Sequence, residues 1–113
     1  MKSLQLREGS SMKHYKLTYL PLFSDDLNEI VHYIAIVLKN PTAADKLVND
    51  VEKAIQERLS MPEAFARYPS AKEREFPYYA IYVRNFTVFY VVKDDMMEVR
   101  RILYNKRNIS QIL

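Results

Sequence analysis

The stretch Phe86-Thr87-Val88-Phe89-Tyr90-Val91-Val92 decides the fold of this chain, because it is apolar on both faces of an extended strand. A strand of this kind belongs inside a sheet that is covered on both sides. Shorter strand-like runs flank it at residues 79–84 and 96–103, and a turn at 93–95 precedes the latter. The short connections predict that the three strands pair as an antiparallel meander.

The N-terminal half predicts one strand and two helices. The alternating run 15–19 predicts a strand, which Pro21 ends. Apolar residues at helical spacing predict a helix over residues 24–38, with Ser24 as its N-cap and Leu38 on its apolar face. Asn40-Pro41 predicts the start of a second helix that ends near Leu59. So short a link predicts an antiparallel helical hairpin.

The predicted fold class is therefore α+β, with the helical hairpin packed on a mainly antiparallel four-stranded sheet. Residues 61–75 predict a loop, and residues 108–113 a short C-terminal turn or helix whose Ile109, Ile112 and Leu113 pack back. The chain has 113 residues, enough for one domain, which we expect at 13–113. Residues 1–12 are interpreted as a leader or an expression remnant.

Composition excludes several kinds of site. The chain has no cysteine, one glycine and two histidines. Thiolate metal sites, cysteine nucleophiles and glycine-rich nucleotide loops are therefore excluded, and we expect neither a metal nor a cofactor. No segment approaches the roughly 18 apolar residues of a membrane span. A cytoplasmic protein without a membrane partner is the expectation.

Positive charge gathers toward the C-terminus. Residues 1–64 carry a net charge of −1 and residues 65–113 a net charge of +4. No acid follows Glu98, whereas Arg100, Arg101, Lys106 and Arg107 are all basic. Such a field attracts phosphate or an acidic protein segment. An ordinary solvated strand end is the alternative interpretation.

Adjacent arginines interrupt the pattern of the last strand. Arg100 and Arg101 would point to opposite faces of a regular strand, yet an unpaired buried guanidinium is very costly. Either a β-bulge turns one outward, or one face is open at this end. The open face would create a basic, aromatic-lined concavity near Arg84, Tyr90, Arg101 and Tyr104. Arginine, lysine and tyrosine can support metal-free RNA cleavage, and aromatic rings can stack bases.

Short motifs follow one another along residues 15–113 in a particular order. They are Asp26-Leu27, Tyr33-Ile34-Ala35, Asn40-Pro41 with Ala43-Ala44, Arg84-Asn85-Phe86-Thr87-Val88-Phe89-Tyr90 and Arg101-Ile102-Leu103-Tyr104-Asn105-Lys106-Arg107-Asn108. In this order and spacing the chain resembles the RelE/ParE superfamily of toxins from type II toxin–antitoxin modules. The resemblance implies one of two activities: ribosome-dependent cleavage of mRNA, or inhibition of DNA gyrase without RNA cleavage.

Residue-level matching within the superfamily favours the gyrase branch. Ribonuclease members carry lysines and an arginine at positions that match Ala80, Tyr82 and Thr87 here, and the tyrosine near their C-terminus falls at Leu113. Arg107 does match the arginine after their last strand. If the protein is a ribonuclease, the candidate catalytic residues are Arg107, Tyr104, Arg84 and Arg101.

The resemblance also implies partners. The candidate residues for binding the target or the antitoxin are Arg84, Arg100, Arg101, Tyr104, Lys106 and Arg107. A cognate antitoxin would lay a helix over the toxin, and an acidic segment suits the basic C-terminal half. Operator DNA would be contacted only through the antitoxin. A degenerate member that only binds antitoxin is the remaining alternative.

Overall fold

The computed structural model describes residues 14–69 and 74–113. Its elements are β1 (Lys16–Tyr19), α1 (Pro21–His32), η2 (Tyr33–Val37), α2 (Pro41–Arg58), β2 (Tyr79–Val83), β3 (Phe86–Lys93), β4 (Met96–Tyr104) and α3 (Ile109–Ile112). The expected α+β fold is confirmed. The expected leader, residues 1–12, lies outside the described part of the chain.

One four-stranded sheet organises the molecule, with strand order β1-β4-β3-β2. The predicted antiparallel meander is confirmed, because β3 pairs antiparallel with both β2 and β4. Each of its strands ends within one residue of the expected bound. β1 runs parallel to β4 and lies at the edge of the sheet. The sheet is therefore mixed, although mainly antiparallel.

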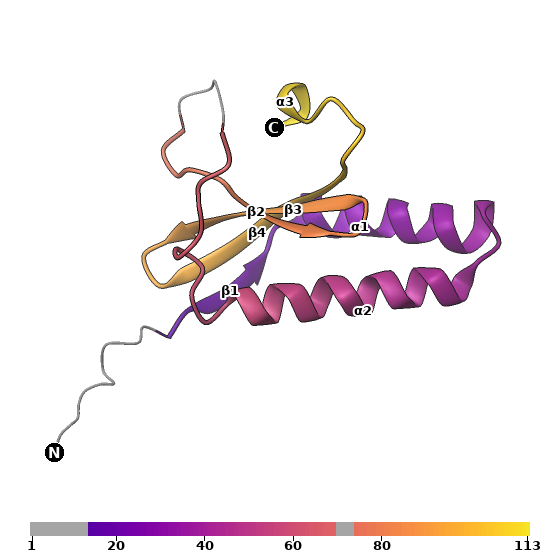
Figure 1. Cartoon of the computed structure of the whole chain (residues 1–113), viewed down its shortest axis with the longest axis horizontal. Helices are drawn as coiled ribbons and strands as arrows, with labels where there is room; N and C mark the ends of the chain where they lie inside the picture. Colours follow the sequence, from indigo (N-terminus) through magenta and orange to yellow (C-terminus); the bar gives the residue numbers. More distant parts are fainter. Residues whose placement is uncertain (1–13, 70–73) are drawn as a thin grey trace, which may run out of the picture.

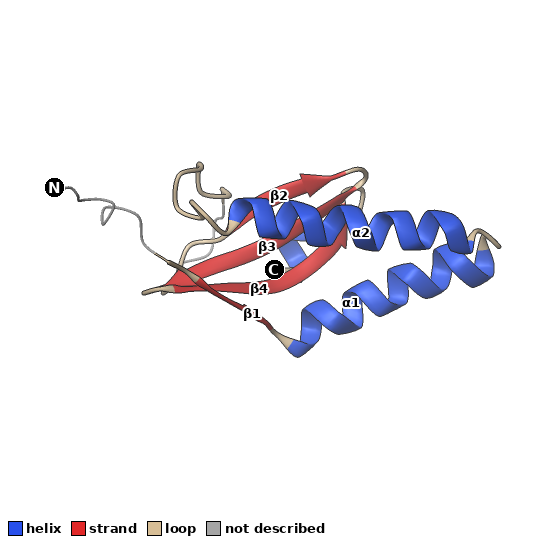
Figure 2. Ribbon diagram, turned by 90° about the horizontal axis from the view of Figure 1, so that it is seen from below, coloured by secondary structure: helices blue, strands red, loops and turns tan. Residues whose placement is uncertain are grey.

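The two long helices form a hairpin on one face of the sheet, and α3 lies on the opposite face (Figure 1). Seen from below, α1 and α2 converge toward an end that projects beyond the strands (Figure 2). None of the described helices is long and apolar enough to cross a membrane.

Proline residues begin both long helices. In α2 the Asn40 side chain accepts a hydrogen bond from the Ala43 N–H at 3.1 Å, and Pro41 follows as the first helical residue, as predicted. The expectation that Ser24 caps α1 is wrong, because α1 begins at Pro21 and has no side-chain cap. Proline lacks the N–H that would need a cap there, and its fixed φ suits the first helical turn.

The end of the first helix departs from the sequence pattern. Residues Tyr33–Val37 form a π-helical turn, closed by a bond from the Leu38 N–H to the Tyr33 carbonyl. Lys39 then adopts a positive φ of 54° and turns the chain toward α2. Leu38, expected on the buried face, is 55% exposed. A π-turn breaks the α-helical repeat, so the apolar stripe no longer continues over the core.

The core has two parts, one on each face of the sheet. The part beneath the hairpin contains Leu47, Val51 and Ile55 of α2 packed against residues such as Tyr90 and Val99. Phe89 and Leu103 belong to the other part, against which Ile109, Ile112 and Leu113 pack as predicted. β3 is therefore covered on both faces, as its continuous apolar sequence predicts.

A polar clamp fixes the C-terminal end of α2 to the sheet. Arg58 donates to the hydroxyl of Tyr90 at 2.8 Å and to the carbonyl of Ala80 at 3.2 Å. The Tyr90 hydroxyl in turn donates to the carbonyl of Pro62 at 2.6 Å. Burial raises the pKa of Tyr90, which keeps the hydroxyl protonated as a donor.

Removal of the Tyr90 hydroxyl tests this clamp. We expect Tyr90→Phe to lower the free energy of unfolding by about 1–3 kcal/mol, because it deprives the guanidinium of Arg58 and the carbonyl of Pro62 of their partner. Urea denaturation measures the change. The same substitution at Tyr82, which is 69% exposed, is the matched control. Equal effects of the two substitutions would contradict the assignment.

Candidate functional site

A β-bulge resolves the position of the two adjacent arginines. Phe89 pairs with Arg101 whereas Tyr90 pairs with Val99, which leaves Arg100 as the extra residue on β4. Of the two alternatives that the sequence left open, the bulge is therefore the one observed. Both guanidinium groups find carboxylate partners, as a partly buried cation requires.

Arg101 is held by α1. Its Nε and Nη2 donate to the two carboxylate oxygens of Asp26 at 2.8 and 2.9 Å. Asp26 also accepts the backbone N–H of Ile102 at 3.1 Å. The Asp26 bonds raise the pKa of Arg101. This bidentate contact gives Arg101 a structural role, because it joins β4 to α1.

Arg100 belongs to a separate ion-pair cluster on the sheet. Its Nε donates to Glu98 at 2.7 Å, and the Nζ of Lys93 lies 3.4 Å from the same carboxylate. Burial by itself would raise the pKa of Glu98, but the hydrogen bonds and positive charges of Arg100 and Lys93 outweigh it and lower the pKa. Sequence analysis assigned Glu98 no role, because nothing in the local pattern shows which cations surround it.

The predicted basic concavity near Arg84, Tyr90, Arg101 and Tyr104 is not observed. Tyr90 is fully buried and is bonded to Arg58. Arg84 lies in the β2–β3 turn with a φ of 55°, and its guanidinium is ion-paired with Asp50 of α2. Arg84 and Arg101 are thus bound to carboxylates of different helices.

The remaining candidates lie close together in sequence, at the end of the last strand and in the turn after it. Tyr104 ends β4, is 38% exposed and packs against the ring of Phe86, with 5.7 Å between centroids. Lys106 and Arg107 are exposed in the following turn. The Asn105 N–H donates to the Asn85 carbonyl at 2.9 Å, which ties this turn to the β2–β3 turn.

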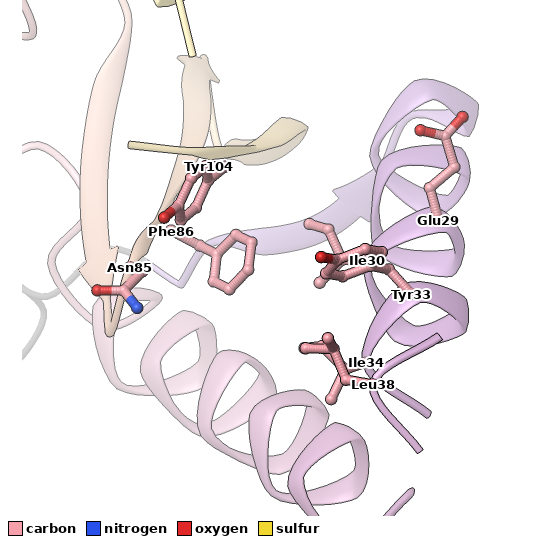
Figure 3. A pocket seen from close by; sticks show the side chains of 8 residues that line it. All are labelled: Glu29, Ile30, Tyr33, Ile34, Leu38, Asn85, Phe86 and Tyr104. Atoms are coloured by element: carbon pink, nitrogen blue, oxygen red, sulfur yellow. The ribbon is translucent and has the colours of Figure 1, made fainter. Parts of the chain in front are cut away.

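A groove of about 580 Å³ opens beside Tyr104. Its walls come from two sides, as Figure 3 shows: Glu29, Ile30, Tyr33, Ile34 and Leu38 on the first helical segment, facing Asn85, Phe86 and Tyr104 at the end of the sheet. Glu29 is the charged residue among those that line it. A mainly apolar groove whose charged residue is an acid fits a protein segment better than a nucleic acid.

Sequence analysis identified part of this groove. It selected Tyr104 as a candidate site residue and included Tyr33 and Phe86 in the family motifs, and all three line the groove. It did not predict that these residues form a groove. The π-turn, which carries Tyr33 at its start and leads into Leu38, has no sequence signal that we recognised.

Among residues 14–69 and 74–113, no three histidine, aspartate or glutamate side chains are grouped so that they could hold a metal ion. Sequence analysis matched the catalytic cations of ribonuclease relatives to Ala80, Tyr82 and Thr87. Thr87 is buried and donates to the side chain of Asn105.

Comparison with known proteins places the chain in a family. Residues 17–109 match the family model described as the ParE toxin of the type II toxin–antitoxin system, parDE.

The chain belongs to the ParE toxin family.

It is therefore the toxin of a type II toxin–antitoxin system. Its fold is similar to that in a structure titled as the chromosomal ParDE toxin–antitoxin system from P. aeruginosa. That match has a TM-score of 0.65 and 20% identity, and covers 80% of this chain and 96% of the other. A RelB–RelE antitoxin–toxin complex from Methanococcus jannaschii matches with a TM-score of 0.44 and 20% identity over 79% of this chain and 91% of the other. No curated protein matches the sequence.

The Asp26–Arg101 contact of this ParE-family toxin is testable by removal of one charge. We expect Asp26→Asn to lower the free energy of unfolding by about 2–4 kcal/mol, because Arg101 keeps a partly buried charge without its partner. Chemical denaturation gives the value. Asp25→Asn, one residue earlier and exposed, is the matched control and should change stability by less than about 0.5 kcal/mol. A neutral Asp26→Asn variant would refute the contact.

The Glu98 cluster predicts a pH dependence. Because the folded pKa of Glu98 is lowered, its ionised form contributes stability above the unfolded pKa of about 4.3, and this contribution disappears as pH falls through the folded pKa. We expect Glu98→Gln to be less stable than the wild type at pH 7, and the difference to shrink between about pH 5 and pH 3. Denaturation at each pH measures it, with the exposed Glu57→Gln as control. A difference that is constant with pH would contradict the prediction.

Proposed function

We propose that this toxin arrests growth by binding DNA gyrase, without cleaving RNA, and that a cognate antitoxin silences it. The observation that carries the proposal is the state of the candidate catalytic cations. Arg84 and Arg101 are bound to Asp50 and Asp26, and the strand positions that supply cations in ribonuclease relatives are Ala80, Tyr82 and Thr87.

RNA cleavage needs groups that can stabilise the charge developing on the phosphate. A guanidinium already bound to a carboxylate, as Arg84 and Arg101 are, would have to give up that interaction before it could contact a phosphate. Of the four candidate catalytic residues, Arg84 is exposed but ion-paired with Asp50, and Tyr104 and Arg107 are exposed at the end of β4 and in the turn that follows it. One phenol and one guanidinium are a weak basis for acid–base catalysis, but they are common anchors in protein interfaces.

The groove supports binding to proteins. Its apolar walls suit an amphipathic helix, and exposed Lys106 and Arg107 follow Tyr104 at one end. An amphipathic helix in the groove would contact the apolar walls, and an acidic segment that continues past Tyr104 would reach these two cations. Family membership supports an antitoxin as this partner, and contacts to operator DNA would then be made by the antitoxin.

Two assays on the purified protein separate the candidate targets. We expect inhibition of gyrase-catalysed DNA supercoiling and no cleavage of ribosome-bound mRNA. Codon-specific cuts with unaffected supercoiling would establish the ribonuclease alternative instead. Normal growth and high soluble yield on expression without antitoxin would favour a degenerate member.

Two substitutions distinguish contact from catalysis. We expect Tyr104→Phe to retain growth arrest, because the ring and its packing on Phe86 persist, and Arg107→Ala to weaken it by roughly tenfold or less, as for one contact among several. Titrated expression measures toxicity, with Tyr82→Phe as the control and circular dichroism as the check on folding. Complete loss of toxicity in both folded variants would indicate chemistry at these residues.

A further inference from the structure

The two sides of the groove differ in charge. Glu29 is the charged residue among those that line the groove, and it lies on the α1 side, whereas Tyr104 lies on the side of the sheet (Figure 3). Exposed Lys106 and Arg107 follow Tyr104 in a tight turn, in which the Arg107 N–H donates to the Tyr104 carbonyl at 3.0 Å. A segment that fills the groove therefore meets negative charge at α1 and positive charge beyond Tyr104.

Glu29 is an exposed carboxylate that the fold does not neutralise with an ion pair. None of the ion pairs within residues 14–69 and 74–113 includes Glu29. The guanidinium of Arg101 is bonded to both carboxylate oxygens of Asp26, so it is already occupied. The negative charge of Glu29 is therefore available to a partner.

A partner helix in the groove would remove water from around Glu29. A carboxylate that loses water without gaining a cation opposes binding, because its hydration is not replaced. An apolar residue opposite Glu29 would leave this cost uncompensated, and an acidic residue there would add repulsion between like charges. A lysine or arginine compensates the cost, and its long apolar stem also packs on the groove wall.

We propose that Glu29 selects the antitoxin by charge. The antitoxin helix in the groove carries a lysine or arginine opposite Glu29, on its side that faces α1, and acidic residues where the chain reaches Lys106 and Arg107. This inference rests on the proposed antitoxin groove. Opposite charges on the two sides also fix the direction of the helix, because a reversed helix would place its basic residue toward Lys106 and Arg107.

Binding of the purified full-length toxin to the antitoxin of the same module tests the charge selection. We expect Glu29→Lys to raise the dissociation constant by about tenfold or more, because it places two cations together, and Glu29→Gln to raise it by less. The loss for Glu29→Lys should shrink as the ionic strength rises. Glu57→Lys makes the same change at an exposed position of α2 outside the groove, and should change the dissociation constant by less than about twofold. Circular dichroism checks that each variant is folded.

Compensating substitutions in the antitoxin provide a second readout. A library of single substitutions in the antitoxin, displayed on yeast and sorted for binding to the E29K toxin, should yield variants in which one lysine or arginine of the helix is replaced by aspartate or glutamate. These variants should bind the wild-type toxin more weakly than the E29K toxin. Unchanged affinity of the E29K toxin would overturn the proposal, and so would a sort that yields no such reversal of charge.

An apolar variant separates this inference from the proposed groove itself. Tyr33 lines the groove and is 53% exposed, so Tyr33→Ser removes apolar contact area without emptying the core. If Tyr33→Ser weakens antitoxin binding and Glu29→Lys does not, the groove is the binding site and the charge selection is wrong. If neither substitution weakens binding, the antitoxin binds elsewhere and both proposals are wrong.

Discussion

The carboxylate of Asp26 closes the edge of the sheet. β1 pairs with β4 only as far as Val99, so the rest of that strand lacks a neighbour on this side. Asp26 accepts the N–H of Ile102 and both facing donors of Arg101, and α1 thereby takes the place of the missing strand. An uncovered strand edge would leave backbone groups unpaired and invite association. The position of the whole hairpin, and of the groove beside it, depends on this contact.

Pairing of arginines with carboxylates also decides which cations are available for function. Arg100 and Arg101 are partly buried and each has a carboxylate partner, and the more exposed Arg84 is also paired with one. A count of charge along the sequence therefore overstates the positive field of the folded C-terminal half. Lys106 and Arg107 are exposed in the turn that follows β4. In the proposed contact with an acidic partner, these two residues would supply positive charge that is not already paired within the fold's ion pairs described above.

Local signals predicted most of the fold. Asn40-Pro41 predicts a helix start because the Asn40 side chain itself supplies the N-cap. The sequence of β3 is apolar on both faces, so it predicts a strand that is buried on both sides. The Asp26–Arg101 pair spans 75 residues, and no local pattern predicts a contact at that separation. The bulge at Arg100 was one of two possibilities, because two adjacent arginines in a strand are compatible with a β-bulge or with an open face of the sheet. The π-turn was missed for a related reason: its apolar residues continue the helical spacing of α1, so nothing local distinguishes a π-turn from an ordinary helical turn.

α1 both anchors the helical hairpin to β4 and lines the groove. Asp26 fixes the helix to β4, and Glu29 and Ile30, one turn later, form the wall of the groove. Because the wall and its anchor belong to one helix, the groove exists before any ligand arrives. A preformed groove costs the toxin little ordering on binding, so the loss of conformational freedom falls mainly on the partner segment. A partner that is disordered until it binds suits such a surface, since its affinity then depends on how well its sequence fills the space between α1 and the sheet end.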